Sequence, residues 1–402
     1  MARKKLLTLV GSICLILIVA SLSLMTACKP ATPEEKTLQI GGLWALSGWA
    51  SANDVKSVQA AQIAVDMFNE RGGLTINGQK YKVELVVEDV KSTAEGAAAA
   101  ANRLVYDKGI KFIAGGLAFM TAGAGTVTEP AQVLRCTFYN VGSPGELGPD
   151  VPYTFSSTCN LGGAIAGIEY LKQAYPDVKN VVEIEPVGAF SPDFGLQVRN
   201  VFQQAGISLV GDVLTYPDEI VDFAPFIAKI TSLDPDALFS ASGMPHHSGA
   251  ILKGIREAGW NKLYAMGCPM SAVELVAISG KDTATNTFTL CDVEGAPGTP
   301  PVLAEFQSRT RAELDDVSLM LGYGANCVWT LLSAIQAAQS LDPTVVKDTW
   351  ENLDTIDTLY GTGWMGGQET YGIKHQVGYK MPVQVIENGE GKFGDWIEVR
   401  IP

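Results

Sequence analysis

The sequence of 402 residues has few of the residues and motifs on which most enzymes depend. It has only three histidines, and the adjacent pair His246-His247 is a poor chelator because neighbouring side chains point to different sides of a helix. It contains no Gly-x-Ser-x-Gly, no phosphate loop ending in Gly-Lys-Ser/Thr, no His-Glu-x-x-His, and no Gly-x-Gly-x-x-Gly after the first predicted strand. Catalytic residues, a resident metal and a cofactor are therefore not expected.

Positive charge is also scarce, because 29 Lys and Arg residues stand against 43 Asp and Glu residues, for a net charge of −14. Such a chain repels nucleic acid and anionic membrane surfaces, so neither is an expected partner. The composition, 47% hydrophobic and 18% charged, is that of a globular protein. At this length two or three domains are expected, each with a core of its own.

The N-terminus has the pattern of an export and anchoring signal. A basic start (residues 3–5) precedes an uncharged stretch (6–27) that is long enough to span a bilayer. It ends in Leu24-Met25-Thr26-Ala27-Cys28, which resembles a bacterial lipobox, although the methionine stands where leucine is usual. We expect cleavage of 1–27, a lipid on Cys28 and a tether at 28–36. The alternative is an uncleaved transmembrane anchor; both place the rest of the chain outside the cytoplasm, tethered to a membrane.

The cysteine count allows disulfides but does not fix them. Of the seven cysteines, one lies in the uncharged stretch and one is assigned to the lipid. The remaining five cannot all pair within one chain, and no Cys-x-x-Cys occurs. Buried free thiols are expected for most of them. The favoured disulfide is Cys268–Cys291, because both flank one strand-helix-strand passage.

The body of the chain alternates apolar strands with amphipathic helices in two series, the second beginning after 153–157. Such alternation, with helices of 10 to 15 residues, is typical of a parallel sheet covered on both faces. The sequence therefore predicts an α/β protein with two doubly wound lobes. Strands are predicted at 37–43, 80–87, 111–114, 134–139, 180–184, 207–214, 237–239 and 262–265, and helices at 94–108, 161–174, 193–205, 223–230, 272–278, 302–312 and 323–339.

A series of short motifs now carries a family resemblance. The motifs, in chain order, are Ile40-Gly41-Gly42, Leu46-Ser47-Gly48, Phe68-Asn69-Glu70-Arg71-Gly72-Gly73, Asn77-Gly78, residues 109–113, 143–147, Asp193-Phe194-Gly195, residues 257–260, and a tail at 361–389. With the lipobox before them, they resemble the leucine/isoleucine/valine-type (type I) periplasmic substrate-binding proteins of ABC importers, in lipoprotein form. The resemblance covers essentially the whole mature chain.

The resemblance implies a type I periplasmic binding protein, whose two lobes are joined by hinge crossovers and close on a small ligand without any reaction. It implies an N-terminal lobe of 37–156 plus about 292–377, and a C-terminal lobe of 157–291 plus about 378–402. The implied partners are a small-molecule ligand and the membrane subunits of an ABC permease, and the protein is expected to be a monomer. No cofactor is implied.

In open α/β sheets a ligand binds outside the carboxyl ends of the strands, where loops lead into helix N-termini. Three loops of the first lobe occupy such positions, at 44–49, 117–121 and 142–143. By resemblance, they hold a carboxylate, and the alternative is that their hydroxyls only cap helices or turns. The candidates from these loops are Trp44, Ser47, Trp49, Ala118, Phe119, Thr121 and Ser143.

On the other side of the cleft, the amino-acid binders of this family place one acid after the first crossover and another after a second-lobe strand. The aligned positions here are Asn160 and Pro269, neither of which is acidic. The neighbouring candidates Phe194 and Met244 are apolar. A buried ammonium needs a paired charge, so we expect an aromatic or apolar carboxylate without an α-amino group. Core packing is the alternative role for the aromatic and methionine residues.

Three alternatives to a transport receptor for such a ligand stay open from the sequence. The same two-lobe form can serve as a ligand-binding sensor for a membrane signalling partner. The protein can also be a true amino-acid or amide binder, if another acid such as Glu185 or Asp193 enters the cleft. A secreted hydrolase on an α/β scaffold is the least favoured, because nucleophile and metal motifs are missing from the sequence.

Overall fold

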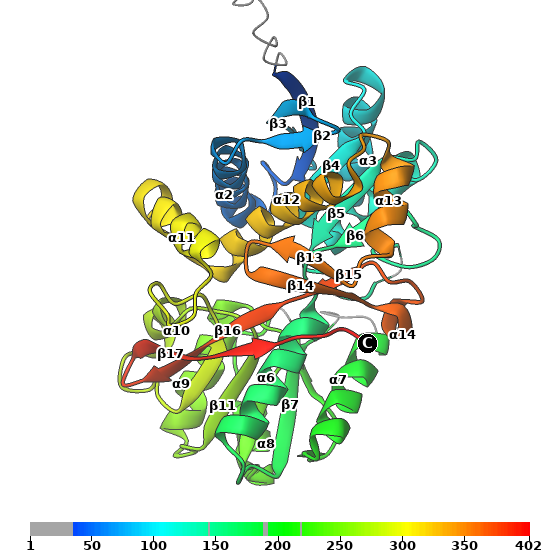
Figure 1. Cartoon of the computed structure of the whole chain (residues 1–402). Helices are drawn as coiled ribbons and strands as arrows, with labels where there is room; N and C mark the ends of the chain where they lie inside the picture. Colours follow the sequence, from blue (N-terminus) through cyan, green and yellow to red (C-terminus); the bar gives the residue numbers. More distant parts are fainter. Residues whose placement is uncertain (1–34, 144, 188–191, 218) are drawn as a thin grey trace, which may run out of the picture.

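Two separate β-sheets divide the chain into two lobes, drawn one above the other in Figure 1. This computed structural model describes residues 35–143, 145–187, 192–217 and 219–402, so the predicted signal peptide and Cys28 lie outside the described residues. Both sheets mix parallel and antiparallel pairs and are flanked by helices, which confirms the predicted two-lobe α/β class. None of the helices in the described part of the chain has the length and apolar character needed to cross a membrane.

The first lobe is built on a nine-stranded sheet in the order β13-β14-β15-β6-β5-β4-β1-β3-β2. Its centre, from β6 to β3, is parallel, and its two edges are antiparallel. The strands are β1 (Lys36–Trp44), β2 (Leu74–Ile76), β3 (Gln79–Asp89), β4 (Phe112–Leu117), β5 (Leu134–Phe138), β6 (Thr154–Ser156), β13 (Thr355–Thr358), β14 (Gly361–Gly366) and β15 (Gln376–Gly378).

The helices of this lobe include the pair that packs most extensively, α2 and α12. Helix α12 also lies against β4 and β5, and nearly all its residues are buried, as expected for a helix apolar all round. The helices are α2 (Ser51–Glu70), α3 (Ala94–Asn102) with a π-helical turn (Arg103–Asp107), α4 (Ala118–Thr121), a 3₁₀ turn (Ala122–Ala124), α5 (Gly125–Thr128), α11 (Pro301–Leu314), α12 (Leu319–Ala338), α13 (Pro343–Glu351) and α14 (Gln368–Tyr371).

The second lobe is built on an eight-stranded sheet in the order β17-β16-β12-β11-β10-β7-β8, with β9 also paired to β7. Its strands are β7 (Asn180–Pro186), β8 (Ser208–Leu209), β9 (Leu214–Tyr216), β10 (Ala237–Ser240), β11 (Leu263–Pro269), β12 (Thr287–Leu290), β16 (Lys380–Glu387) and β17 (Glu390–Glu398). Its helices are α6 (Asn160–Ala174), α7 (Pro192–Ala205), α8 (Ala224–Leu233), α9 (Pro245–Glu257) and α10 (Ala272–Ser279).

The chain passes between the two sheets three times, from β6 through α6 to β7, from β12 through α11, α12 and α13 to β13, and directly from β15 to β16. The end of the chain turns back, because Gly367 donates its N–H to Ile401 and Thr370 donates to Pro402. These passages are the crossovers that the sequence predicts. The residue-level boundaries of the lobes stay a prediction.

Helix α6 packs unusually close to β11 because both elements carry glycines at the contact. A Cβ atom on Gly163 would come within 2.5 Å of the Gly267 carbonyl oxygen, and one on Gly167 within 2.8 Å of the Gly267 Cα. Only glycine permits this approach. The contact fixes the start of α6, at Asn160, beside the carboxyl end of β11.

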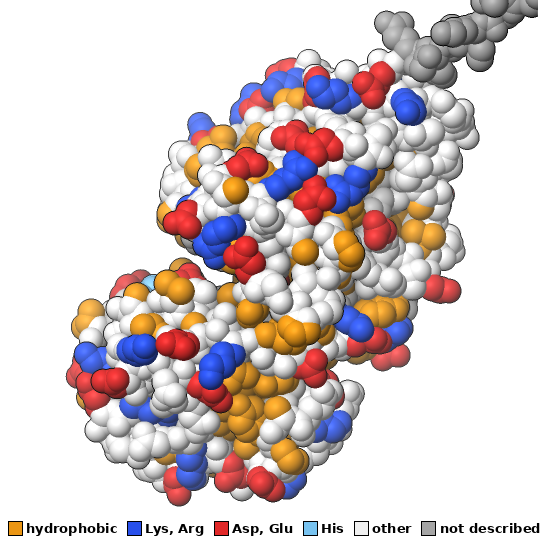
Figure 2. All heavy atoms as spheres, turned by 60° about the vertical axis from the view of Figure 1, so that its left-hand side comes forward, with side chains coloured by type: hydrophobic (Ala, Val, Ile, Leu, Met, Phe, Trp, Pro, Cys, Tyr) orange, Lys and Arg blue, Asp and Glu red, His pale blue; other side chains and the backbone are white. Residues whose placement is uncertain are grey.

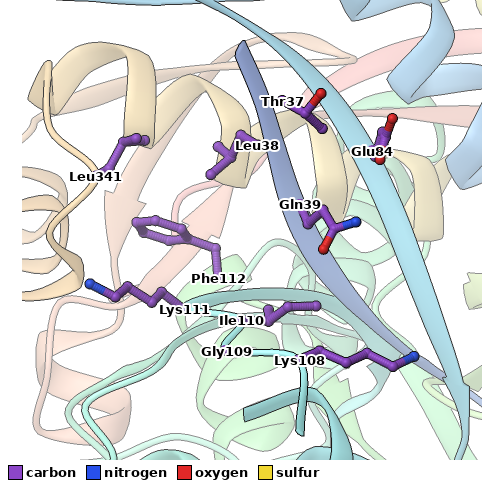
Figure 3. A pocket seen from close by; sticks show the side chains of 10 residues that line it. All are labelled: Thr37, Leu38, Gln39, Glu84, Lys108, Gly109, Ile110, Lys111, Phe112 and Leu341. Atoms are coloured by element: carbon purple, nitrogen blue, oxygen red, sulfur yellow. The ribbon is translucent and has the colours of Figure 1, made fainter. Parts of the chain in front are cut away.

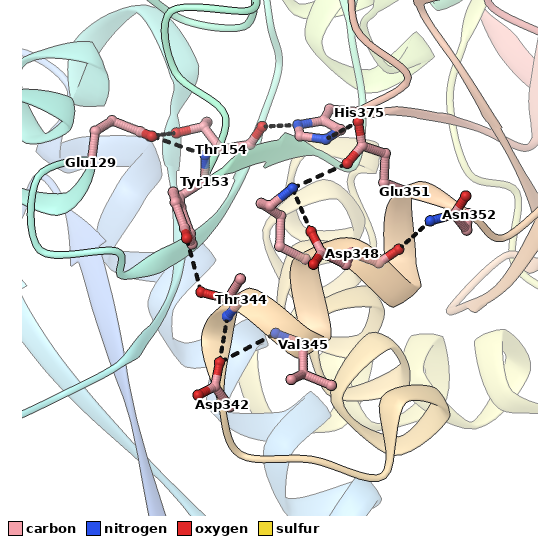
Figure 4. Close-up of polar contacts among 11 residues, drawn as sticks. Glu129, Tyr153, Thr154, Asp342, Thr344, Val345, Asp348, Glu351, Asn352 and His375 are labelled. Atoms are coloured by element: carbon pink, nitrogen blue, oxygen red, sulfur yellow. Dashed lines mark hydrogen bonds and ion pairs between the residues drawn. The ribbon is translucent and has the colours of Figure 1, made fainter.

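A polar network anchors the third crossing to the first lobe (Figure 4). The buried His375 ring stacks on Phe155 and makes an Nδ1 hydrogen bond to the Thr154 carbonyl at 3.0 Å. Its Nε2 atom lies 3.6 Å from the Glu351 carboxylate of α13. Burial lowers the pKa of His375 to about 4, so the ring is neutral near pH 7.

The structure differs from the sequence predictions in several elements. The single helix expected at 94–108 ends as a π-helical turn, and the strand expected at 207–214 is instead two short strands, β8 and β9. Helix α13 and strands β13 and β14 were not predicted, and β16 and β17 make the second sheet antiparallel at one edge. Pro343 at the first position of α13, after the Asp342 N-cap, is the local signal that predicts that helix.

The five described cysteines are all buried and free, so the predicted Cys268–Cys291 disulfide is wrong for this structure. The strand register explains why. The register between β11 and β12 shifts between Ala265 and Pro269, and Pro269 then pairs with Leu290. The Thr289 hydroxyl donates to the Cys268 carbonyl at 2.9 Å, so Thr289 rather than Cys291 lies beside Cys268.

Candidate functional site: the notch between the lobes

A notch separates the two lobes on the face shown in Figure 2. The chain enters β1 at the end of the first lobe that lies farthest from the second lobe (Figure 1). Strands β1, β4 and β5 are parallel, so their carboxyl ends share the edge that faces the second lobe. The loops that follow these strands are therefore the first-lobe wall of the notch.

The loop after β1 is held in shape by Asp89, the last residue of β3. Its Oδ1 accepts the Leu46 N–H at 2.9 Å, and its Oδ2 accepts the Ser47 hydroxyl at 2.6 Å. Desolvation opposes ionisation of this carboxyl, but these hydrogen bonds prevail and hold the pKa of Asp89 below its usual value. The Ser47 hydroxyl is therefore engaged with Asp89, and its role in this structure is to order the loop.

The two tryptophans of this segment have opposite environments. Trp44 is fully buried, its Nε1 donates to the Ser57 hydroxyl at 3.2 Å, and its ring covers Gly115, where a Cβ atom would come within 2.1 Å. Trp49 is 67% exposed. The structure therefore places Trp44 in the lobe core and leaves Trp49 available to a ligand.

The loop after β4 begins with the short helix α4. Ala118 and Thr121 are buried, and Phe119 is half-buried against the core. The Thr121 hydroxyl donates to the Leu117 carbonyl at 3.0 Å, while its own carbonyl accepts from Arg135 at 2.9 Å. These bonds order the loop, so Thr121 also acts within the protein in this structure.

The loop after β5 closes around a buried carboxyl group. Glu146 accepts the Val141 N–H at 2.8 Å, and its own N–H donates to the Ser143 carbonyl at 3.2 Å. Burial raises the pKa of Glu146 to about 7, although hydrogen bonds from Val141 and Ser143 act in the other direction. Ser143 thus lies half-exposed at a turn that Glu146 stabilises.

Asn160 begins α6 at the first crossing and is only 3% exposed. Its backbone N–H donates to the Asn140 carbonyl at 2.9 Å. Neither Oδ1 nor Nδ2 of its side chain makes a hydrogen bond of good geometry to the described residues, although the amide lies beside the Tyr139 hydroxyl. A buried amide without partners costs free energy, so a ligand that pairs with it gains that much in affinity.

Residues that the sequence reasoning missed surround this amide. We call Tyr139, Asn160, Cys268 and Tyr323 the inter-lobe cluster. The rings of Tyr139 and Tyr323 have centroids 6.3 Å apart. Burial, with a smaller contribution from the Cys268 thiol, raises the pKa of Tyr139, and burial raises that of Tyr323 well above its usual value. Both phenols are therefore neutral and able to donate a hydrogen bond.

The second-lobe candidates fall into two groups. Phe194, in α7, is buried in the core. Met244 precedes α9 and is 45% exposed, and Pro269 ends β11 half-buried, beside the inter-lobe cluster. Glu185 is largely buried within β7, and the nearest charge that acts on it is Arg199 of α7. The side chain of Asp193 lies outside the described residues.

An acid that acts on the inter-lobe cluster is Asp292, where the chain leaves β12 for the second crossing. Its Oδ2 accepts the Tyr360 hydroxyl at 3.0 Å. Burial raises the pKa of Asp292 to about 7, while the bond from Tyr360 acts the other way. Its charge also acts on Tyr323. No group of His, Cys, Asp and Glu side chains in the described part of the chain could hold a metal ion.

A separate cavity of about 530 Å³ lies at the opposite edge of the first sheet (Figure 3). The first residues of β1 and β4, including Thr37 and Phe112, line it together with Lys108 and Lys111. None of the predicted site residues lines this cavity. It is therefore distinct from the notch.

Two lobes joined by three crossings, with loops at the facing strand ends, are the architecture of a two-lobe binding protein. Comparison with known families agrees with that class. Residues 37–390 match the family model described as periplasmic binding protein, and the chain belongs to this family. Its members are extracytoplasmic substrate-binding components of transporters, not enzymes.

Solved structures share the fold across their full length. One is the substrate-binding protein LivJ of a branched-chain amino acid transporter from Streptococcus pneumoniae, in complex with isoleucine (20% identity, TM-score 0.70, 90% of this chain and 100% of that one). A second is a leucine-binding protein LivK from Thermotoga maritima (19% identity, TM-score 0.71, 90% of this chain and 99% of that one). A third is a solute-binding protein of an ABC transporter from Rhodopseudomonas palustris, in complex with 3,4-dihydroxybenzoic acid (17% identity, TM-score 0.68, 90% of this chain and 98% of that one). At these identities the likeness establishes the type I fold.

Proposed function

We propose that this protein is a lipid-anchored receptor that captures a small aromatic or apolar carboxylate without an α-amino group and delivers it to an ABC permease. The observation that carries the proposal is Asn160. Its buried amide makes no hydrogen bond of good geometry to the described residues, although the Tyr139 hydroxyl lies beside it. By the family resemblance, it stands where a receptor for α-amino acids needs a carboxylate. An amide can donate to a carboxylate or carbonyl oxygen, but it offers no charge to an ammonium.

The rest of the notch supports a ligand of this kind. Trp49 on the first-lobe wall and Met244 on the second offer exposed apolar surface. Tyr139 and Tyr323 offer neutral phenols, and Pro269 adds no charge. The Rhodopseudomonas palustris structure, with its dihydroxybenzoic acid, supports the view that this fold can accept an aromatic acid.

The discrimination should be large. Burying an ammonium without a compensating charge costs several kcal/mol, and each 1.4 kcal/mol is about tenfold in affinity. We therefore expect preference for the deaminated acid by as much as about a thousandfold. Calorimetry with leucine, phenylalanine, 4-methyl-2-oxopentanoate, phenylpyruvate and benzoate tests this. Micromolar binding of leucine or phenylalanine, with the deaminated acids silent, would overturn the ligand assignment.

A true amino-acid binder is the second candidate, and Asp292 is the observation that favours it. Burial is the main cause of the raised pKa of Tyr323, and the Asp292 carboxyl group adds a smaller contribution, which indicates that it lies near the inter-lobe cluster. If leucine binds, Asp292→Asn should abolish that binding and leave deaminated acids unaffected. Loss of binding for both kinds of ligand would instead assign Asp292 to the hinge alone.

Lipid attachment is the part of the proposal that concerns the N-terminus. The lipobox at 24–28 and the tether at 29–36 support cleavage before Cys28. Mass spectrometry of the native N-terminus should find a lipid-modified Cys28. A chain that still begins at Met1, or a Cys28→Ala variant that remains lipidated, would contradict the anchor and leave the ligand proposal untouched.

A further inference from the structure

Two buried thiols meet inside the first lobe, behind the loops that form its wall. Cys136 lies in β5 and Cys327 in α12, and both have zero exposure. The Cys327 Sγ atom lies 2.7 Å from the Cys136 carbonyl oxygen, and it accepts the Gly115 N–H at 3.1 Å. The Cys136 Sγ atom lies 3.9 Å from the Thr137 carbonyl oxygen. Burial and, to a smaller extent, the Cys327 thiol raise the pKa of Cys136. Residues 191 positions apart are thus in contact.

The other described cysteines have different surroundings. Cys159 caps α6 by accepting the Gly162 N–H at 3.3 Å. Cys268 does not lie beside Cys291. None of these three forms a hydrogen bond to another cysteine thiol within the described residues. Cys136 and Cys327 are therefore the one pair in this part of the chain for which the contacts favour a covalent bond.

Cys136 and Cys327 are both free thiols in this structure, and we propose that they form a disulfide bond in the exported protein, joining β5 to α12. The two thiols lose two protons and two electrons as the S–S bond forms. The electron acceptor is a disulfide, either a small molecule or an oxidoreductase, which is reduced to two thiols in exchange. The extracytoplasmic location of the family permits this chemistry, and the proposal does not depend on the identity of the ligand.

The bond would stabilise the wall of the notch. It closes one of the longer loops the chain allows, and long loops gain most from a cross-link. It also links β5 to α12, in which Cys327 accepts a hydrogen bond from the Gly115 N–H of β4. Since β4 and β5 lead into two of the ligand loops, reduction should lower the melting temperature by several degrees and loosen these loops first.

Peptide mapping of the full chain, purified from the cell envelope without reductant, tests the proposal. After alkylation of free thiols in denaturant, trypsin should release residues 136–172 joined to 312–347. Cys159 shares the first peptide, so Cys159→Ser is the matched control and should retain the joined peptide. Cys136→Ser and Cys327→Ser should each abolish the joined peptide. Reductant should lower the melting temperature of the wild type but not that of a variant with both Cys136→Ser and Cys327→Ser.

Two results would overturn the proposal. One is complete alkylation of Cys136 and Cys327 in the wild-type protein. The other is a joined peptide that disappears in Cys159→Ser, because that assigns the bond to Cys159. If the Cys136→Ser variant fails to fold, the wild-type map and the Cys159→Ser control still decide the question.

Discussion

The two walls of the notch differ in how their polar groups are used. On the first-lobe wall, the Ser47 hydroxyl is bonded to Asp89 and the Thr121 hydroxyl to the Leu117 carbonyl. At the start of the second lobe, the Asn160 amide is buried without a partner of good geometry among the described residues. Met244 is exposed on the same lobe. The two hydroxyls of the first-lobe wall are thus engaged within the protein, whereas the Asn160 amide is not, although Oε1 of Glu146 in the loop after β5 is also buried without a hydrogen bond to the described residues.

This difference indicates a division of labour during binding. A wall whose loops are already ordered loses little conformational entropy when a ligand docks on it. A wall with unsatisfied groups gains hydrogen bonds only when a ligand is present, and such differential contact is what shifts a hinged protein to its closed state. We therefore expect the ligand to dock on the first lobe and the second lobe to close over it.

The largest expected effect concerns the order of the first-lobe wall. Trp44→Ala removes a fully buried ring and should lower the free energy of unfolding by about 3–5 kcal/mol. The matched control is Trp49→Ala, five positions away, which should change stability by less than about 0.5 kcal/mol because Trp49 is 67% exposed. Urea denaturation followed by circular dichroism measures both. Equal losses would show that Trp49 also belongs to the core.

The second prediction concerns a negative charge introduced at Asn160, at the start of the second lobe. Asn160→Asp places a carboxylate in the buried site, so a carboxylate ligand should lose about a hundredfold in affinity and an α-amino acid should gain. Asn160→Ala, which adds no charge, should lose about tenfold. Calorimetry with phenylpyruvate and phenylalanine compares the three proteins. Unchanged preference in Asn160→Asp would show that Asn160 does not contact the ligand.

The third prediction compares the apolar surfaces of the two walls. Trp49→Ala should weaken binding about tenfold or more, since an aromatic ring that becomes buried on binding contributes roughly 1.5–3 kcal/mol. Met244→Ala should weaken it only about threefold, because methionine is smaller and more adaptable. A larger effect at Met244 than at Trp49, measured by calorimetry, would mean that the second lobe makes the main apolar contact.

Much of the fold could be predicted from the sequence because strands and helices have distinct hydrophobic periods. The parallel centres of both sheets follow from that alternation, and the crossovers follow from the family resemblance. The antiparallel edges do not, since β13 and β14 are short and rich in glycine and threonine. Their strand character comes from pairing with neighbours, which periodicity does not report.

The site was predicted less well, for a related reason. The strand-end rule located the loops that hold Trp49 and Ser143, and the structure leaves both accessible. It could not tell whether an aromatic residue at a strand end turns into the core, as Trp44 does. It also missed Tyr139 and Tyr323, which meet across 184 positions only because α12 packs on β5. Tyr139 is the last residue of the strand predicted at 134–139, and in the structure β5 ends at Phe138, so a strand boundary one residue earlier would have brought Tyr139 under the same rule.

The smallest expected effect is a difference in how His375, beside the third crossing, and Asp292, at the second crossing, make the stability depend on pH. His375, beside the third crossing, has a pKa lowered by burial to about 4. Its unfolded pKa is near 6.5, so the unfolded chain binds the proton more readily, and this stability is lost as the pH falls from about 6.5 towards 4. Asp292, at the second crossing, has a pKa raised to about 7, so its contribution is lost as the pH rises from about 4 to 7.

Between pH 6.5 and 5.5 the histidine contribution amounts to about 1 kcal/mol, since each pKa unit corresponds to about 1.4 kcal/mol. Other buried carboxyls with raised pKa values, such as Glu146, titrate in this range in every variant, so each variant is compared with the wild type. In urea denaturation, Asp292→Asn should shift the change in stability on acidification towards loss, and His375→Gln should shift it towards gain by about 1 kcal/mol. Substitution of the exposed His246 by Gln is the control and should leave the wild-type profile unchanged. If His375→Gln keeps the slope of Asp292→Asn, the acid sensitivity arises elsewhere, and the third crossing is not the pH-sensitive one.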